Sequence, residues 1–163
     1  MWMLAWLAGL VLASSFFARW QDQRFNPNPQ PVSRHAGQTV EVRLQANPQG
    51  HFVCSGMING QPVELLVDTG ATDVAIPAAL ARQLRLEAGP PSLQQTAGGT
   101  VSGYLTWLDR LQLGDILLRH VRAVVMPDFP GQAVLLGMSA LRQLEFTQQQ
   151  QTLVLRQSVT EPS

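Results

Sequence analysis

The stretch from Leu65 to Thr72, Leu-Leu-Val-Asp-Thr-Gly-Ala-Thr, places the strongest constraint on what this chain can fold into. Val67 has the character of the end of a buried strand, and Asp68 puts a carboxylate where a strand would still be apolar. Burying an unpaired carboxylate is costly, so Asp68 needs a partner or a shared proton. Gly70 lets the backbone turn sharply and approach a ligand or a second chain closely. The alternative is that Asp68 only opens an ordinary turn after a strand.

The composition narrows the class of protein. The 163 residues allow one domain with additional segments. Eleven basic residues balance eleven acidic ones without an evident basic patch, so nucleic acid is not an expected partner. Cys54 is the only cysteine, which excludes an internal disulfide. The three histidines (His35, His51 and His120) stand apart without zinc-site spacing, and we expect no metal and no cofactor.

The N-terminus has the pattern of a membrane segment. Residues 1–18 carry no charged side chain and would reach roughly 27 Å as a helix, close to the thickness of a hydrocarbon core. Trp2 and Trp20 lie near its two ends, where aromatic rings favour the membrane interface. We predict a transmembrane anchor over residues 1–20. A cleaved signal peptide is the alternative, which the lack of a basic start disfavours.

Residues 21–38, rich in proline, asparagine and glutamine, predict an extended linker without hydrogen bonds that holds the domain off the bilayer. From residue 39 onward, β-prone runs predict one folded domain over 39–157, followed by a tail over 158–163.

Within the domain, Asn59-Gly60 predicts a hairpin turn whose second arm leads into Asp68. Short helices are expected over 76–84 and 139–144. A long strand is expected over 104–113, with three of its apolar residues in the core: Leu105, Trp107 and Leu111.

Two further stretches follow the Asp68 motif along the chain. Thr96-Ala97-Gly98-Gly99 places paired glycines between β-prone runs, which predicts the tip of a hairpin. Val134-Leu135-Leu136-Gly137 is an apolar run that ends at a glycine and leads into the second short helix. Each stretch alone is common, as a surface hairpin or as a strand that ends at a glycine.

Together, these elements resemble the pepsin–retropepsin clan of aspartic proteases. Their order, after an N-terminal membrane segment, resembles the bacterial membrane-anchored retropepsin-like branch (clan AA), and the resemblance covers about Val40 to Arg156. Gly98 and Ala140 depart from the asparagine and phenylalanine expected at these positions. The resemblance implies an all-β, single-lobe fold with a barrel-like sheet, a flap hairpin and one or two short helices, preceded by one transmembrane helix.

The resemblance also implies roles for individual residues. Asp68 would be catalytic, and four residues would support the active site: Thr69, Gly70, Ala71 and Thr72. The flap would comprise Thr96, Ala97, Gly98 and Gly99, and the packing beneath the site would come from Leu135, Leu136 and Gly137.

One Asp-Thr-Gly per chain implies a homodimer in which two Asp68 carboxylates activate a water to hydrolyse an extended peptide or protein substrate. The alternative is a non-catalytic dimerisation or peptide-binding module at the membrane. The resemblance places the protein in the membrane as a single-pass protein, with its protease domain extracytoplasmic, in the periplasm of a Gram-negative host.

Overall fold

The computed structural model of this protein describes residues 25–127 except 97 and 98, residue 129, and residues 131–158. Strands dominate the described chain, and the all-β class is confirmed. Their bounds are β1 (Ser33–Ala36), β2 (Thr39–Gln45), β3 (Val53–Ile58), β4 (Gln61–Val67), β5 (Val74–Pro77), β6 (Pro91–Thr96), β7 (Gly99–Leu113), β8 (Ile116–Met126), β9 (Val134–Leu136), β10 (Glu145–Gln149) and β11 (Thr152–Ser158). Two short helices are described, α2 (Ala78–Gln83) and α3 (Met138–Leu141).

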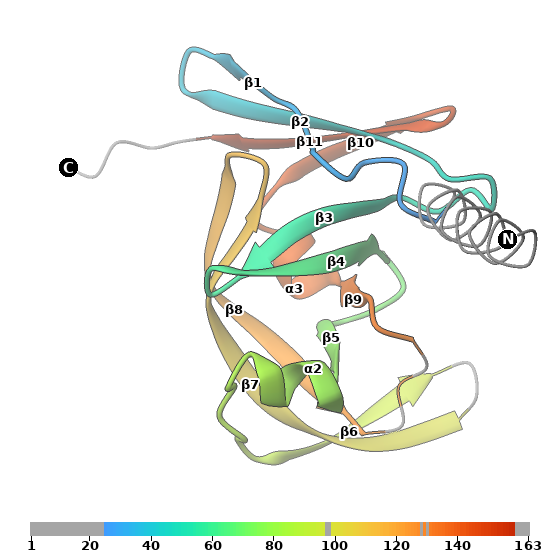
Figure 1. Ribbon diagram of the computed structural model, residues 1–163, viewed down its shortest axis with the longest axis vertical. Coiled ribbons are helices and arrows are strands. Elements are labelled where there is room, and N and C mark those ends of the chain that lie inside the picture. The colour runs from blue at the N-terminus through green and yellow to red at the C-terminus, as the bar shows by residue number, and fades with distance from the viewer. Residues whose placement is uncertain (1–24, 97–98, 128, 130, 159–163) are drawn as a thin grey trace, which may run out of the picture.

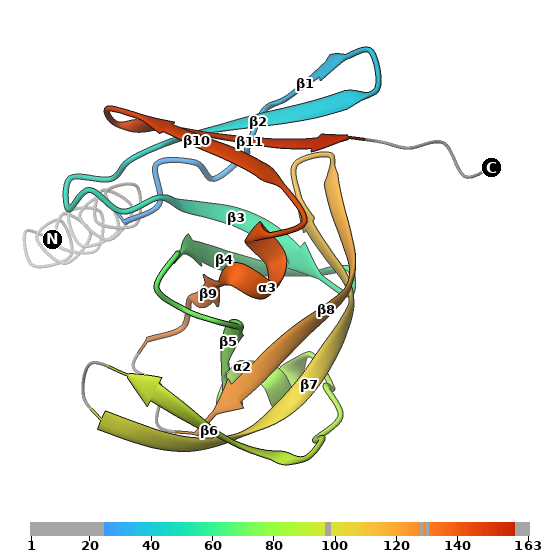
Figure 2. The ribbon, with the colours of Figure 1, turned by 180° about the vertical axis from the view of Figure 1, so that it is seen from behind.

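A seven-stranded sheet forms the body of the domain, in the order β3-β4-β9-β5-β8-β7-β6. Because β3 also pairs with β7, the sheet closes on itself like a barrel. The long β7–β8 hairpin curves along one side of the molecule (Figure 2). Side chains such as Leu65, Ile76 and Leu108 are fully buried and fill the interior. The barrel-like sheet expected from the sequence is thus confirmed.

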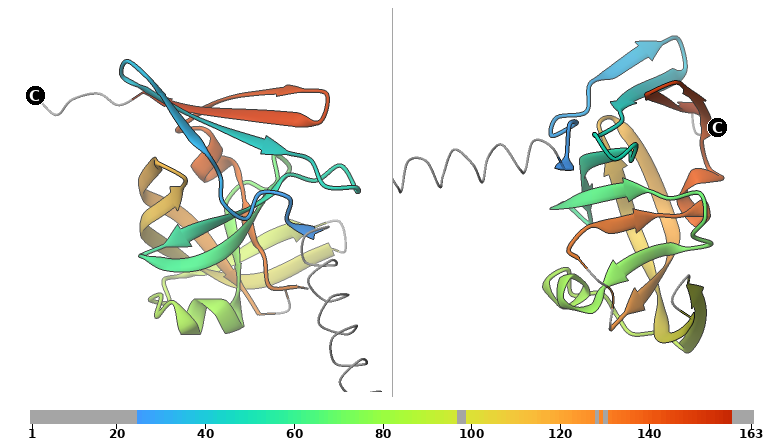
Figure 3. Two further views of the ribbon diagram at one scale, coloured as in Figure 1. Left: turned by 45° about the horizontal axis from the view of Figure 1, so that its top comes forward. Right: turned by 90° about the vertical axis from the view of Figure 1, so that its right-hand side faces the viewer.

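A second sheet, of four strands in the order β1-β2-β11-β10, lies across the opposite end of the molecule from the β6–β7 hairpin (Figure 1). Apolar residues alternate along β2 and form a continuous run in β11, and Val42, Leu44, Leu153 and Leu155 are buried beneath this sheet. Viewed from the other directions, the sheet covers the barrel as a separate layer (Figure 3).

The prediction of an extended linker over residues 21–38 is wrong for residues 25–38, the part of it that the structure describes. Asn28 lies buried between β2 and β3, where its side-chain amide donates to the carbonyl oxygens of Gln45 (2.9 Å) and Val53 (2.7 Å). Farther along, β1 pairs with β2. The side chains of Asn26 and Asn28 supply hydrogen bonds in this proline-rich stretch, and Asn47 Nδ2 donates to the Phe25 carbonyl oxygen at 3.1 Å. The folded unit therefore already includes Phe25 and does not begin at residue 39.

The predicted membrane anchor, residues 1–20, lies outside the described residues, as does most of the predicted tail. Among the residues that are described, no helix has both the length and the apolar character needed to cross a membrane.

The two expected helices exist but are shorter than predicted. Residues 74–77 form β5, buried and paired in parallel with β8, so α2 begins only at Ala78. The second helix, α3, ends at Leu141, and residues 142–144 form a turn and a bend. Pairing with a neighbouring strand outweighed local helix propensity at Ile76, which the sequence pattern could not show.

Candidate active site

The Asp68 loop begins where β4 ends. β9 runs parallel to β4, with Val67 opposite Leu136, and the backbone N–H of Asp68 donates to the carbonyl oxygen of Leu136 at 3.2 Å. The two sequence elements singled out from the resemblance are therefore neighbours in space. The roles predicted for their residues stay predictions.

A tight turn fixes the direction of the Asp68 side chain. The backbone N–H of Gly70 donates to Asp68 Oδ1 at 2.9 Å, and the N–H of Ala71 donates to the Asp68 carbonyl oxygen at 3.3 Å. A Cβ atom on Gly70 would lie 3.1 Å from Asp68 Oδ1, so a glycine leaves room for the carboxylate to fold back onto the loop. Asp68 is half-buried, whereas Thr69 and Gly70 are exposed. The carboxylate is thus held in place at the surface.

The loop continues across the start of α3. Met138 N–H donates to the Ala71 carbonyl oxygen at 2.8 Å, and Ser139 N–H donates to the Thr72 carbonyl oxygen at 2.9 Å. Because these two amides belong to the first turn of α3, they have no partner within the helix and are free to hold the loop. The carbonyl oxygens of Ala71 and Thr72 therefore already accept a hydrogen bond from within the domain.

Three further residues help to hold the Asp68 loop in place. The sequence alone did not assign them to the site. Asp73 is buried, and its Oδ1 accepts a hydrogen bond from Arg122 Nε at 2.8 Å. Ser139 Oγ donates to the Arg122 carbonyl oxygen (2.7 Å) and accepts from the N–H of Val74 (3.0 Å). The sequence could have indicated the role of Asp73, because it directly precedes an apolar run and a buried carboxylate requires a partner.

Two of the predicted flap residues, Thr96 and Gly99, pair with each other in the β6–β7 hairpin, and Gly99 has a φ of 115°. Ala97 and Gly98 lie outside the described residues. In β7 of this hairpin, Val101 packs against a small apolar cluster that Leu135 of β9 also contacts. The hairpin is therefore connected by packing to the strand that lies beside Asp68.

A cavity of about 300 Å³ adjoins Asp68. Its walls come from the loop before β3, the end of β4, and the hairpin β10–β11, and they comprise Gly50, His51, Phe52, Val67, Asp68, Thr69, Phe146, Gln148 and Leu153. Apolar and polar side chains both line it, and Asp68 and His51 are its titratable residues.

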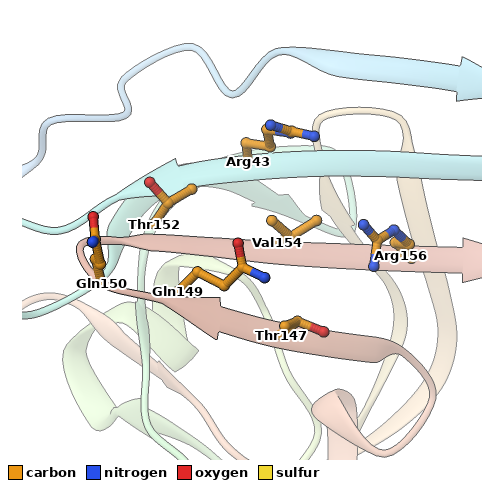
Figure 4. A pocket seen from close by; sticks show the side chains of 7 residues that line it. All are labelled: Arg43, Thr147, Gln149, Gln150, Thr152, Val154 and Arg156. Atoms are coloured by element: carbon orange, nitrogen blue, oxygen red, sulfur yellow. The ribbon is translucent and has the colours of Figure 1, made fainter.

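A larger depression of about 900 Å³ lies on the outer face of the four-stranded sheet, as Figure 4 shows. It is lined by Arg43, Thr147, Gln149, Gln150, Thr152, Val154 and Arg156, and it shares no residue with the cavity beside Asp68. Its two arginines both hydrogen-bond to Glu41, which lowers the pKa of that carboxyl.

The remaining chemistry near the site is limited. Burial raises the pKa of the Cys54 thiol to about 12, so this cysteine is protonated and unsuited to act as a nucleophile. Within the described part of the chain, no cluster of three or more His, Cys, Asp or Glu residues could hold a metal ion. The titratable groups that line the cavity are therefore the Asp68 carboxylate and the His51 imidazole.

Comparison with known proteins shows which family model, relative and solved structures this chain is similar to. Residues 54–143 match the family model described as gag-polyprotein putative aspartyl protease. A curated Sinorhizobium protein, named only as an uncharacterized protein in the cobV 5' region, is 33% identical over 113 residues, which cover 66% of this chain and 48% of that protein. The chain thus spans about half the length of this relative.

Two solved structures share the fold. A retropepsin-like aspartic protease from Rickettsia conorii superposes with a TM-score of 0.60 at 22% identity, covering 78% of this chain and 96% of that one. The EIAV protease in complex with the inhibitor HBY-793 superposes with a TM-score of 0.50 at 22% identity, covering 61% of this chain and 92% of that one.

Proposed function

Because this chain belongs to the gag-polyprotein putative aspartyl protease family, with a retropepsin-like fold, we propose that it is a homodimeric aspartic endopeptidase. The observation that carries this proposal is the position of Asp68. Its carboxylate stands at the surface at the end of β4, fixed by the Gly70 amide and braced through Leu136. An ordinary Asp-Thr-Gly turn would not require the second element, β9 with α3, to hold the loop.

The chemistry needs two carboxylates that face one water. Two close carboxylates cannot both ionise cheaply, so the pair shares one proton and titrates as a unit. The ionised member accepts a proton from the water, while the protonated member donates to the carbonyl oxygen of the peptide bond. The hydrogen bond from Gly70 to Asp68 Oδ1 keeps each carboxylate in a fixed orientation for this exchange.

One chain supplies only half of this pair, because its sequence contains a single Asp-Thr-Gly. A twofold axis beside Asp68 brings together two copies of the same loop, and a self-complementary interface makes one motif sufficient. In this proposal Thr69, which is exposed beside Asp68, reaches across that axis with its hydroxyl. The monomer is then inactive.

The substrate in this proposal is an extended peptide segment, bound as an added strand between the β6–β7 hairpin and the Asp68 loop. The hairpin acts as the flap that closes over the peptide and excludes water. Leu93 on β6 is 73% exposed and offers an apolar contact for a substrate side chain.

The membrane location belongs to the proposal as well. We propose that residues 1–20 anchor the protein as a single span, with the protease domain outside the cytoplasm. The support is the uncharged apolar run of the sequence alone. Resistance of the full chain to alkaline extraction from membranes tests the anchor, and protease accessibility in intact spheroplasts tests the orientation.

The decisive experiment replaces Asp68 with asparagine in the full chain and measures cleavage of an unbiased peptide library between acid and neutral pH. The amide oxygen of asparagine can still accept the Gly70 hydrogen bond, so the fold and dimer are expected to persist while cleavage falls at least about 1,000-fold. Asp109→Asn, at an exposed aspartate of β7, is the matched control and is expected to cleave like the wild type.

Retained cleavage by Asp68→Asn would contradict the proposed mechanism. Absence of cleavage by a folded wild-type dimer over the whole pH range would instead favour the non-catalytic peptide-binding module.

A further inference from the structure

The long β7–β8 hairpin (Figure 2) carries side chains on its outward side that the proposed chemistry does not use. Five exposed residues define what we call the outer hairpin surface: Trp107, Arg110, Arg119, His120 and Arg122. The rings of Trp107 and His120 are stacked, with an angle of 12° between their planes. Tryptophan is highly buried on average, so this half-exposed ring offers an apolar contact to a partner.

The surface exists because both strands interrupt their alternation at the same level. Asp109 and Arg110 are exposed in succession on β7, and Arg119 and His120 are exposed in succession on β8. In a regular strand, one residue of each pair would point into the barrel. His120 has a φ of 50°, which is uncommon for a residue other than glycine. Backbone conformations of this kind are costly and cluster at sites that bind ligands.

Two arginines of this surface, Arg110 and Arg119, stand directly opposite each other in the β7–β8 ladder. Like charges in this position repel each other. Within the part of the chain that the structure describes, neither arginine forms an ion pair, although Asp109 directly precedes Arg110. A carboxylate of another molecule, placed between the two guanidinium groups, accepts charge-assisted hydrogen bonds from both. The arginine pair is therefore complementary to an acidic side chain.

Arg122 connects the outer hairpin surface to the Asp68 loop. It stands opposite Trp107 in the ladder, and its Nε donates to Oδ1 of the buried Asp73 at 2.8 Å. Since Asp73 follows Asp68 by five residues, their Cα atoms are at most about 18 Å apart, which is the length of about five extended residues. A polypeptide that is cleaved at Asp68 and continues past Asp73 therefore reaches Arg122 and Trp107.

We propose that the outer hairpin surface binds an acidic segment of the protein substrate, about five to ten residues away from the bond that is cleaved. The inference rests on the proposed function and adds a preference for a class of substrate. An acidic side chain binds between Arg110 and Arg119, and a neighbouring apolar side chain packs on Trp107. Tryptophan and arginine are enriched among the residues that supply most of the binding energy at protein interfaces.

The charge of the surface favours this occupant over two others. A second copy of the same surface would bring arginines against arginines, so self-association here is opposed by like charges. Nucleic acid binds through many phosphate contacts, whereas this surface offers the single pair Arg110 and Arg119 on a chain without net charge. One carboxylate between two arginines needs no wider basic region.

The first test measures binding without cleavage, in the full Asp68→Asn chain purified in mild detergent. The probe is the peptide Glu-Leu-Glu-Glu-Leu-Glu with a rhodamine label, followed by fluorescence anisotropy, and the same peptide with glutamine in place of glutamate is the neutral comparison. The acidic peptide is expected to bind more tightly, and added salt to weaken it. Equal affinity for the two peptides, or affinity for a thymidine hexanucleotide as high as for the acidic peptide, would overturn the inference.

Substitutions then locate the binding site. Arg110→Gln and Trp107→Ala are each expected to weaken binding of the acidic peptide at least about 5-fold. Because Arg110→Gln changes only an exposed side chain, it keeps the test independent of folding. Arg82→Gln is the matched control, since it removes the same charge from an exposed position on α2, which packs on the barrel interior through Ala81. Equal loss in Arg82→Gln and Arg110→Gln would overturn the inference.

A second test measures cleavage by the wild-type chain. The best-cleaved peptide of the library is extended at each end, through a flexible linker of about five residues, by either the acidic or the glutamine segment. The acidic substrate is expected to have a KM at least about 5-fold lower at an equal kcat, because the added contact is the same in the ground state and the transition state. Arg110→Gln is expected to remove this difference and Arg82→Gln to keep it. Equal KM values for the two substrates would overturn the inference.

The two tests together separate this inference from the proposed function. If the chain cleaves peptides through Asp68 but does not distinguish the acidic from the glutamine segment, the binding surface is wrong and the protease proposal stands. If the acidic peptide binds and Arg110→Gln weakens it, but the wild-type chain cleaves nothing, the surface stands as a site for acidic peptides and the protease proposal fails.

Discussion

Gly137 lies directly against Ala71: a Cβ atom at position 137 would stand 2.8 Å from the carbonyl oxygen of Ala71 and 2.7 Å from the carbonyl carbon of Asp73. Both neighbours are backbone atoms, which cannot rotate away as the end of a side chain could. The φ of Gly137 is −85°, a value that alanine also adopts, so the need for glycine here is one of space alone. The close approach lets α3 hold the Asp68 loop.

Gly137→Ala is therefore expected to destabilise the domain by roughly 1–3 kcal/mol, the usual range for overpacking, and to abolish most of the proposed cleavage by displacing the loop. Urea unfolding and peptide cleavage measure the two effects. Gly37→Ala is the control, because a Cβ atom there meets nothing within 4 Å and only the positive φ of 58° opposes it. A Gly137→Ala protein as active as Gly37→Ala would show that the loop tolerates the shift.

The ion pair between Asp73 and Arg122 fixes the far end of the same loop. Asp73 is 5% exposed, whereas the Arg122 side chain is 46% exposed, so solvent screens much of the attraction. Arg122→Gln leaves a buried carboxylate without its cationic partner, and we expect a loss of about 1–2 kcal/mol. Arg119→Gln, at an exposed arginine of the same strand, is expected to have little effect.

A double-mutant cycle with Asp73→Asn isolates the pairwise contribution. If the pair positions the loop, the cycle shows coupling in the rate of cleavage at saturating substrate as well as in the free energy of unfolding. Additive effects of the two substitutions would mean that the ion pair is incidental.

Local backbone chemistry was predictable from the sequence. Asn59 and Gly60 have φ values of 50° and 81°, as the turn type favoured by Asn-Gly requires, and the β3–β4 hairpin is confirmed. The strand that leads into Asp68 and the apolar element ending at Gly137 are found at the expected residues. Each of these depends on residues that are adjacent in the chain.

Features that depend on tertiary contacts were missed. Trp107 was expected in the core but is 50% exposed and stacks on His120, with ring centroids 4.4 Å apart. The alternation of buried and exposed residues breaks in both β7 and β8 near His120, whose φ is 50°. A bend of this kind cannot be read from hydropathy, nor can the pairing of Asp73 with an arginine 49 residues away.

The ion-paired Glu41 gives the domain a pH dependence with a definite sign. Arg43 Nε (2.7 Å) and Arg156 Nε (2.8 Å) donate to its carboxylate, and these hydrogen bonds hold the pKa of Glu41 below its usual value of 4.5. In the unfolded chain the carboxyl takes up a proton at a higher pH than in the folded one. The contribution to stability is therefore complete at neutral pH and is lost as the pH falls through the folded-state pKa.

Glu41→Gln is accordingly expected to be less stable than the wild type at pH 7, with the difference shrinking from about pH 5 downward. Thermal unfolding at several pH values measures it, and added salt should reduce the difference, since Arg43 is half exposed. A difference that does not vary with pH would assign the effect of the substitution to packing.

The last prediction concerns Asn28, which joins the N-terminal segment to the barrel. Its side chain accepts from the Gln45 N–H at 2.8 Å and donates to Gln45 and Val53, while its own carbonyl oxygen accepts from the Ser55 N–H at 3.1 Å. Asn28→Ala leaves three backbone groups of β2 and β3 without these side-chain partners in a mostly buried place. We expect a loss of about 2–4 kcal/mol.

Hydrogen exchange at the Gln45 amide reports this contact directly, because that N–H bonds to Asn28 Oδ1. Faster exchange at Gln45 is expected in Asn28→Ala and not in Gln30→Ala, which changes an exposed residue of the same segment. By the same argument, a chain that begins at Phe25 should keep the stability of the barrel, and a chain that begins at Thr39 should lose it together with β1. Equal stability of the two truncated chains would mean that the segment before β2 is only a tether, as the proline-rich sequence first indicated.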